Sequence, residues 1–156
     1  ATTSDSGTPG EISGSMSTST TYYYGAYARL VKNKKPKLTC TTASDKFTVN
    51  TSNGNGALTY PVGLITADEV AMAGGVYGSS NTNRSYYLYT NQYYWSGSPS
   101  DIDSSGYADE FIVYSSGSIG INYVVDYGIG ARPVVSLSSK AKLSGSGTYD
   151  DVYTVS

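Results

Sequence analysis

The sequence contains no histidine and one cysteine, and only 14 % of its 156 residues are charged. Without histidine, the chain has no Ser-His-Asp or Cys-His catalytic set, no histidine metal ligand and no ordinary general base near neutral pH. Cys40 can form no internal disulfide, and we expect it to be a buried small apolar residue rather than a nucleophile. These absences exclude the commonest hydrolase sites.

Length and charge narrow the remaining classes of protein. A chain of 156 residues suits one domain whose core folds without disulfides. The net charge of −2 and the pI near 4.9 argue against nucleic-acid binding, which needs a basic surface. No apolar run in the sequence approaches the about 20 residues that span a membrane. We therefore expect no nucleic-acid partner and no membrane-spanning segment in this chain.

Hydroxyl groups take the place of the missing charges. The chain has 25 serines and 17 threonines, a profile that favours β-structure and secreted or surface-displayed proteins. Residues 1–21 are rich in Ser, Thr and Gly, which predicts a tail or linker. One local basic run, expected to be a solvated turn before Pro36, consists of Arg29, Lys32, Lys34, Lys35 and Lys37.

Short runs of apolar and aromatic residues, separated by Gly, Ser and Asn, predict several strands. The first covers Tyr22–Val31, with Gly25 as a bulge. The most apolar, Arg132–Leu137, is expected to be central, with Pro133 at its start, where a missing N–H is tolerated. Further strands are expected at Lys37–Thr42, Lys46–Val49, Tyr86–Tyr89, Tyr93–Ser96, Glu110–Tyr114 and Asn122–Val125, with a loop at Asn50–Ala57 and a terminal hairpin of Lys142-Leu143 and Val152–Val155.

One helix is predicted within Leu64–Gly75, at about residues 66–74. Thr66 and Glu69 have the spacing of a capping box, in which each side chain bonds the other residue's backbone N–H. Gly74 supplies a helix end. The expected apolar face consists of Val70, Met72 and Ala73.

The stretch Tyr86–Tyr127 has the composition of a recognition surface. It holds 9 of the 17 tyrosines and the only tryptophan, Trp95, and it has no lysine. Tyrosine offers a large amphipathic surface at low entropic cost, while Ser, Gly and Asn offer adaptable hydrogen bonds. The alternative is that these aromatic residues are simply strand residues, because strands favour them.

Four segments of the chain together resemble a group of surface proteins from gut-type Firmicutes: PVGLITADEVAMAGG, YYLYTNQYYWSGSPS, GARPVVSL and SGSGTYDDVYTV. The C-terminal domains of those proteins are similar to the C-type-lectin / formylglycine-generating-enzyme fold. The resemblance spans Tyr22–Val155 and implies an α+β fold with small twisted antiparallel sheets, one clear short helix and long irregular loops, as a single domain over residues 22–156. It also implies that Arg132, in a Gly-x-Arg-Pro motif, is a buried scaffold residue near the helix.

Proteins of this fold often carry variable residues between the tryptophan and the Arg-Pro strand. In some, a diversity-generating retroelement rewrites adenines there, which favours the residue types that dominate Tyr93–Tyr127. The resemblance therefore implies a ligand-binding face on a fixed scaffold. Trp95 taken alone is expected in the core. The candidate contact residues are Tyr93, Tyr94, Trp95, Asp101, Asp103, Tyr107, Tyr114, Asn122, Tyr123, Asp126 and Tyr127.

Metal and catalytic sites are weakly indicated. Asp101 and Asp103, followed by Ser105 and Gly106, match the start of a calcium loop, but position 12 is Ile112 instead of the bidentate glutamate. A polar turn is the expected alternative to a looser Ca²⁺ loop, and no cofactor is expected. The formylglycine-generating members of the family depend on two cysteines, which this chain lacks, and no spacing singles out a catalytic pair of carboxylates.

Two functions follow from these patterns. The first is a non-enzymatic extracellular recognition or adhesion module of the bacterial cell surface, which binds a protein or glycan through its Tyr/Ser/Asn/Asp-rich face. The second is a structural subunit of an extracellular filament or pilus, which self-associates when the N-terminal segment completes the sheet of a neighbouring copy. Packing of the segment up to Val31 on its own domain would favour the first.

Overall fold

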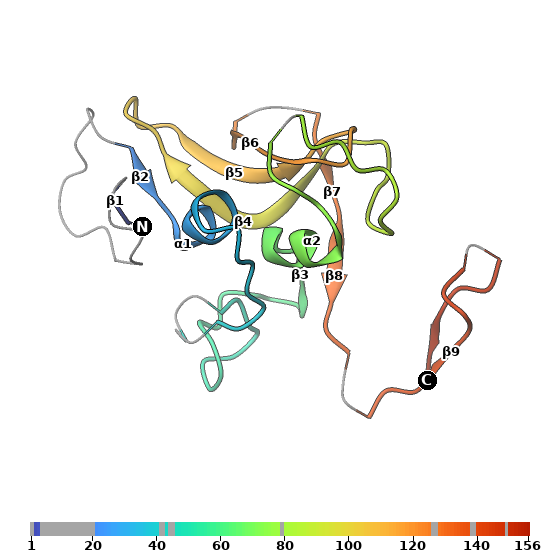
Figure 1. Cartoon of the computed structure of the whole chain (residues 1–156). Coiled ribbons are helices and arrows are strands. Elements are labelled where there is room, and N and C mark those ends of the chain that lie inside the picture. The colour runs from blue at the N-terminus through green and yellow to red at the C-terminus, as the bar shows by residue number, and fades with distance from the viewer. Residues whose placement is uncertain are drawn as a thin grey trace.

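The computed structural model describes residues 2–3, 21–40, 43, 46–78, 80–125, 128–137, 140–148 and 150–156. They form an α+β fold with one large curled sheet, two small sheets and two short helical segments (Figure 1). The α+β class predicted from the sequence is therefore confirmed. Most of the predicted tail, residues 1 and 4–20, lies outside the described residues.

The large sheet has the strand order β1-β2-β4-β5-β6, and β7 pairs with the start of β4 in parallel. Its two longest members, β4 and β5, pair antiparallel, and β4 has register shifts on both sides of Pro99. The bounds of the strands are Thr2–Thr3 for β1, Tyr22–Tyr23 for β2, Tyr94–Ile102 for β4, Ala108–Val113 for β5, Ile119–Tyr123 for β6 and Gly130–Ala131 for β7.

Two hairpins with the same local geometry connect β4 to β5 and β5 to β6. Each contains a Ser-Ser-Gly sequence, and Gly106 and Gly117 both have a φ of +85°. In the first, Gly106 N donates to Asp103 O, and in the second Gly117 N donates to Tyr114 O. This is the three-residue hairpin loop that ends on a left-handed residue, for which glycine is the natural choice.

The last three described strands of the chain belong to the two small sheets. β3 (Val62–Leu64) pairs with β8 (Pro133–Val135), while β9 (Leu143–Ser144) pairs with β10 (Thr154–Val155) as the predicted terminal hairpin. Figure 1 shows this hairpin standing away from the rest of the structure. Pro133 is the first residue of its strand, as predicted.

The prediction that Arg132–Leu137 is a central strand is wrong. The only strand that pairs with β8 among the described residues is β3, and Val135 and Leu137 are 60 % and 50 % exposed. The centre of the large sheet is instead the serine-rich β4. Beyond Tyr94, its inward residues Ser96, Ser98 and Ser100 are small, which lets the second helix approach closely. Ser98 Oγ accepts a 2.9 Å hydrogen bond from Ala67 N in that helix.

The predicted strand Tyr22–Val31 is also wrong beyond its first two residues. Helix α1 (Gly25–Tyr27) continues into the π-helical turn η1 (Ala28–Lys32). Ala26 and Leu30, four residues apart, bury one face in the core, and the rings of Tyr23 and Tyr27 stack at 4.0 Å. The apolar spacing therefore has the helical period and not the alternation of a strand.

Helix α2 (Ala67–Ala73) is the predicted helix, and its capping box is confirmed. Thr66 Oγ1 accepts from Glu69 N at 3.2 Å, and the Glu69 carboxylate accepts from Thr66 N at 2.8 Å. Gly74 ends the helix with a φ of 121°. The predicted apolar face is correct for the fully buried Val70 and wrong for Met72, which is 55 % exposed.

We expect Thr66→Ala to lower the free energy of unfolding by about 1 kcal/mol, because it removes the side-chain acceptor for a helix N–H. Chemical denaturation measures this loss. Thr66→Ser keeps the hydroxyl and should fall within a few tenths of a kcal/mol of the wild type. Equal losses in both variants would contradict the assignment of the cap.

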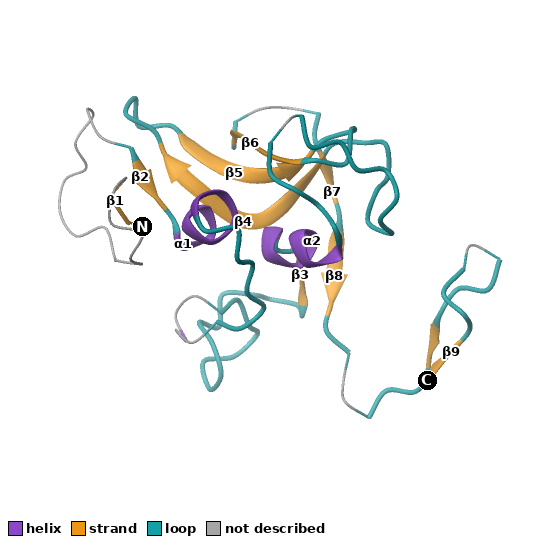
Figure 2. Ribbon diagram, in the orientation of Figure 1, coloured by secondary structure: helices purple, strands orange, loops and turns teal. Residues whose placement is uncertain are grey.

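Figure 2 shows the helical segments on one side of the large sheet. The core side chains come from these segments, from the sheet strands β4, β5 and β6, and from the adjoining loops. The most buried large apolar residues of the core are Val70, Phe111, Val113 and Ile119. None of the described helices is long and apolar enough to cross a lipid bilayer.

Some predicted strands are irregular segments. Tyr86–Tyr89 forms no strand, but Tyr86 and Leu88 belong to the core, and the Tyr86 hydroxyl donates to Gly117 O at 2.8 Å. Residues 37–40 and 46–49 also form no strand, while residues 41–42 lie outside the described part of the chain. Cys40 is exposed, which corrects the expectation that it is buried. It lies in this extended segment, outside the core cluster.

Candidate functional site

The large sheet has a second face that does not pack on the helices, called here the outer face. Cross-strand pairing places Trp95, Ile112 and Gly120 in one row across β4, β5 and β6 of this face. Pro99, Glu110 and Asn122 form the next row. Ile112 is fully buried but does not belong to the core cluster that contains the helices, as expected for a residue of the opposite face. Tyr93 and Tyr114 adjoin these rows and complete the outer face.

Two tyrosines lie at one end of the outer face. The rings of Tyr93 and Tyr114 meet edge to face with centroids 5.5 Å apart. The Tyr114 ring crosses Gly120 so closely that a Cβ at this position would collide with the ring. Tyr93 is 47 % exposed. Glycine therefore lets one aromatic ring lie flat on the sheet, where it supports a second ring that faces solvent.

Glu110 is the acidic residue of the outer face. Its side chain is half-buried, and burial raises the pKa of its carboxyl above the ordinary value. Asn122, its cross-strand neighbour, is also half-buried. A carboxylate and an amide beside aromatic rings can hydrogen-bond hydroxyl or amide groups of a ligand that stacks on the rings.

The raised pKa of Glu110 predicts a pH dependence of stability. The unfolded chain ionises at the ordinary pKa of glutamate, and the folded chain ionises at a higher pH. Protonated Glu110 therefore favours the folded state at low pH, and this contribution is lost as the pH rises through the folded pKa. We expect Glu110→Gln to be more stable than the wild type at neutral pH. Urea titrations from acid to neutral pH should show this gain shrinking toward low pH; a gain that does not change with pH would contradict the prediction.

A second aromatic pair lies at the β4–β5 hairpin. Tyr107 and Tyr123 meet edge to face at 5.5 Å, and the Tyr123 hydroxyl donates to Asp103 Oδ2 at 3.5 Å. The other oxygen of Asp103 accepts hydrogen bonds from Ser105 N at 2.8 Å and Tyr107 N at 2.9 Å. Asp103 therefore holds the turn together. Among the described residues, no three Asp, Glu or Cys side chains are grouped as metal ligands.

Asp101 lies inside the protein. It is 7 % exposed, it accepts a hydrogen bond from Ser100 Oγ at 2.6 Å, and it faces Asp109 across β4 and β5. Burial raises the pKa of its carboxyl, while the hydrogen bond from Ser100 and the interaction with Asp109 oppose that rise. These contacts make Asp101 a structural residue near the end of β4.

Tyr94 is also internal. It is 3 % exposed, its hydroxyl donates to Leu88 O at 3.1 Å, and the Arg132 guanidinium lies 5.3 Å from its ring centroid. Arg132 is half-buried and donates to Leu88 O at 2.6 Å, so it ties β8 to the loop before β4. Its partners are the Leu88 carbonyl in this loop and the Tyr94 ring in β4, so it is a scaffold residue, as the resemblance implied, although it is half-buried and not fully buried.

The structure therefore separates the candidate contact residues. Tyr93, Trp95, Tyr114 and Asn122 lie on the outer face, while Asp103, Tyr107 and Tyr123 lie at the hairpin. Trp95 is half-buried and outside the core cluster. Asp126 and Tyr127 lie outside the described residues.

Glu110 was not among the predicted contact residues, but the structure places it on the outer face beside Asn122. The alternation of side chains along β5 could have predicted this position, because Glu110, Ile112 and Tyr114 follow one another at intervals of two residues and share a face.

Comparison of the chain with protein-family models, with curated proteins and with solved structures gave no match.

Proposed function

We propose that this chain is a non-enzymatic extracellular recognition module that binds a protein or glycan through the outer face of its large sheet. The observation that carries the proposal is the grouping of Tyr93, Trp95 and Tyr114 beside Glu110 and Asn122 on a sheet face that no helix covers. Aromatic side chains next to a few polar groups are typical of binding surfaces. The aromatic rings would supply the affinity, and Glu110 and Asn122 the specificity.

The finer fold assignment belongs to the same proposal. We infer a C-type-lectin-like arrangement, displayed at a bacterial cell surface, from the segments that carry the resemblance. The capped helix α2 beside a curled antiparallel sheet supports this assignment. Within it, β4 to β6 would be the scaffold and the outer face the variable surface.

Binding to immobilised glycan and protein arrays tests the proposal. For any ligand found, we expect Tyr93→Ala and Tyr114→Ala each to weaken binding at least roughly tenfold, as truncation of an aromatic hot spot does. Tyr60→Ala is the matched control, because Tyr60 is 73 % exposed and lies in the loop before β3, outside the strand rows of the outer face. A ligand whose affinity is unchanged by both outer-face variants would overturn the assignment of the site.

The alternative is a filament subunit that assembles through its N-terminal segment. The packing of Ala26 and Leu30 into the core of their own domain supports the recognition module instead. Light scattering with and without residues 1–21 distinguishes the two functions. Monomers in both forms would rule out the filament, and large assemblies that vanish on truncation would establish it.

A further inference from the structure

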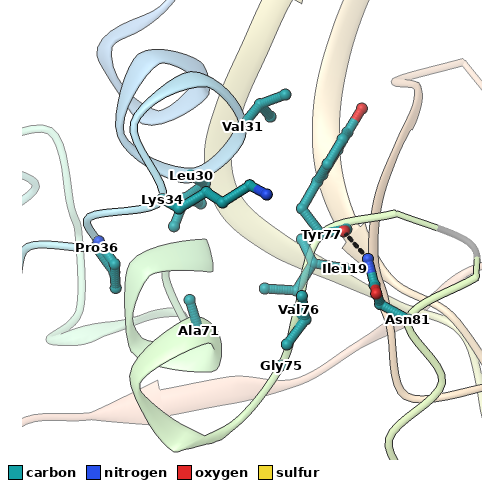
Figure 3. A pocket seen from close by; sticks show the side chains of 10 residues that line it. All are labelled: Leu30, Val31, Lys34, Pro36, Ala71, Gly75, Val76, Tyr77, Asn81 and Ile119. Carbon is teal, nitrogen blue, oxygen red and sulfur yellow. Dashed lines mark hydrogen bonds between the residues drawn. The ribbon is translucent and has the colours of Figure 1, made fainter.

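A cavity of about 300 Å³ lies away from the outer face, between η1, the end of α2 and the segment that follows α2. Figure 3 shows its lining. Most of the lining is apolar: Leu30, Val31, Pro36, Ala71, Val76 and Ile119. The volume is at the lower end of the range for small-molecule sites, roughly 300 to 1,000 Å³. The space therefore suits a small ligand with an apolar body.

One lining residue is charged. Lys34 is exposed and lies at the mouth of the cavity, with its ammonium pointing toward Tyr77 (Figure 3). No carboxylate among the described residues pairs with this ammonium, since the ion pair between described side chains joins Arg29 and Asp68. The lining contains no acidic side chain. The electrostatic preference of the cavity is therefore for one negative charge.

The backbone at Lys34 gives independent support. Asn33 caps the end of η1, and Lys34 follows it with a φ of 52°. This position after a helix normally holds glycine, because the left-handed conformation costs other residues roughly 1–2 kcal/mol. A lysine here is a strained choice for the turn, and strain of this kind is often retained where a side chain has a task.

The polar group opposite Lys34 is already used. Asn81 Nδ2 donates to Tyr77 O at 2.6 Å, which fixes the segment after α2 as one wall (Figure 3). Lys34 therefore remains as the charged donor at the mouth. We propose that this cavity binds a small monocarboxylate with an apolar body, whose carboxylate pairs with Lys34 while its apolar part lies against Ala71, Val76 and Ile119.

Titration of the full chain with octanoate, octan-1-ol and octylammonium, followed by backbone amide NMR shifts, tests the proposal. We expect saturable octanoate binding with shifts at Ala71, Val76 and Ile119, at least roughly tenfold tighter than octanol binding. Octylammonium should bind no more tightly than octanol. Equal affinity for octanoate and octanol, or no saturation at millimolar concentration, would overturn the proposal.

Lys34→Asn removes the charge and keeps a residue that tolerates the left-handed backbone. It should weaken octanoate binding at least roughly tenfold and leave octanol binding unchanged. Lys35→Asn makes the same change of charge at a neighbouring lysine that does not line the cavity, and should stay within about twofold of the wild type. Equal losses of octanoate affinity in Lys34→Asn and Lys35→Asn would show that net charge alone causes the effect, and this result would refute the site. Ala71→Leu should fill the cavity and abolish binding of both octanoate and octanol.

Discussion

Replacing Arg29 by alanine is expected to lower the free energy of unfolding by about 3 kcal/mol, the low end of the cost of leaving a buried charge unpaired. The Asp68 side chain is 4 % exposed and accepts from Arg29 Nε at 2.8 Å, Arg29 Nη2 at 2.7 Å and Lys37 N at 2.7 Å. Without Arg29, the donor to this carboxylate that remains among the described residues is Lys37 N. The Arg29 side chain is 37 % exposed, so water would offset part of the loss.

Two further comparisons, a control arginine and a double-mutant cycle, make this prediction specific. Arg84→Ala removes an exposed arginine and should change the free energy of unfolding by less than about 0.5 kcal/mol. Arg29→Ala combined with Asp68→Ala should cost less than the sum of the two single changes, because removing both partners leaves no unpaired buried charge. Urea denaturation of the wild type, Arg29→Ala, Asp68→Ala and the double variant gives the double-mutant cycle. An additive double variant would show that Arg29 acts through packing and not through Asp68.

Replacing Gly117 by alanine is expected to cost about 3 kcal/mol. One part is conformational, because a φ of +85° penalises any residue with a Cβ by roughly 1–2 kcal/mol. The other part is steric, because the new Cβ would collide with the backbone carbonyl of Asn83. Backbone cannot move aside as a side-chain end can, and overpacking of this kind costs roughly 1–3 kcal/mol. The loss is measured by thermal or urea unfolding.

Gly106 is the matched control for this variant. It occupies the equivalent position of the other Ser-Ser-Gly hairpin and has the same φ of +85°, but a Cβ there meets open space. Gly106→Ala should therefore cost only the conformational part, roughly 1–2 kcal/mol. The difference between the two variants measures the contact between the β5–β6 turn and Asn83. Equal losses of stability in Gly106→Ala and Gly117→Ala would mean that the turn and Asn83 can move apart at no cost in free energy.

Local patterns were sufficient for the parts of the fold that depend on neighbours in the chain. The capping box needs only Thr66 and Glu69, three residues apart, and the structure has both of its hydrogen bonds. The terminal hairpin and the position of Pro133 at the start of a strand were predicted on the same basis. Such features depend on hydrogen bonds and φ angles within a few residues, so composition and spacing determine them.

Tertiary contacts decided the rest. Tyr22–Val31 has strand-favouring aromatic residues, yet its second half is helical; Ala26 and Leu30 reach the core, and Arg29 pairs with Asp68, 39 residues away. The apolar Arg132–Leu137 lies at the margin, while serines occupy the centre because small side chains let α2 pack against β4. Trp95 and Tyr94 are neighbours in sequence, but they point to opposite faces of the sheet.

The sequence by itself determined the capped helix, the terminal hairpin and the tyrosine-rich stretch, because each depends on composition or on spacing over a few residues. The class of fold followed from the resemblance of longer segments. Only the tertiary structure decided which of those tyrosines face solvent, that Glu110 and Asn122 are cross-strand neighbours, and that Lys34 lines a largely apolar cavity. The physical reason is that the burial of a side chain depends both on the surface that carries it and on the surface that packs against it. A strand residue is covered or exposed according to what packs on its face, and the packing segments are distant in the chain.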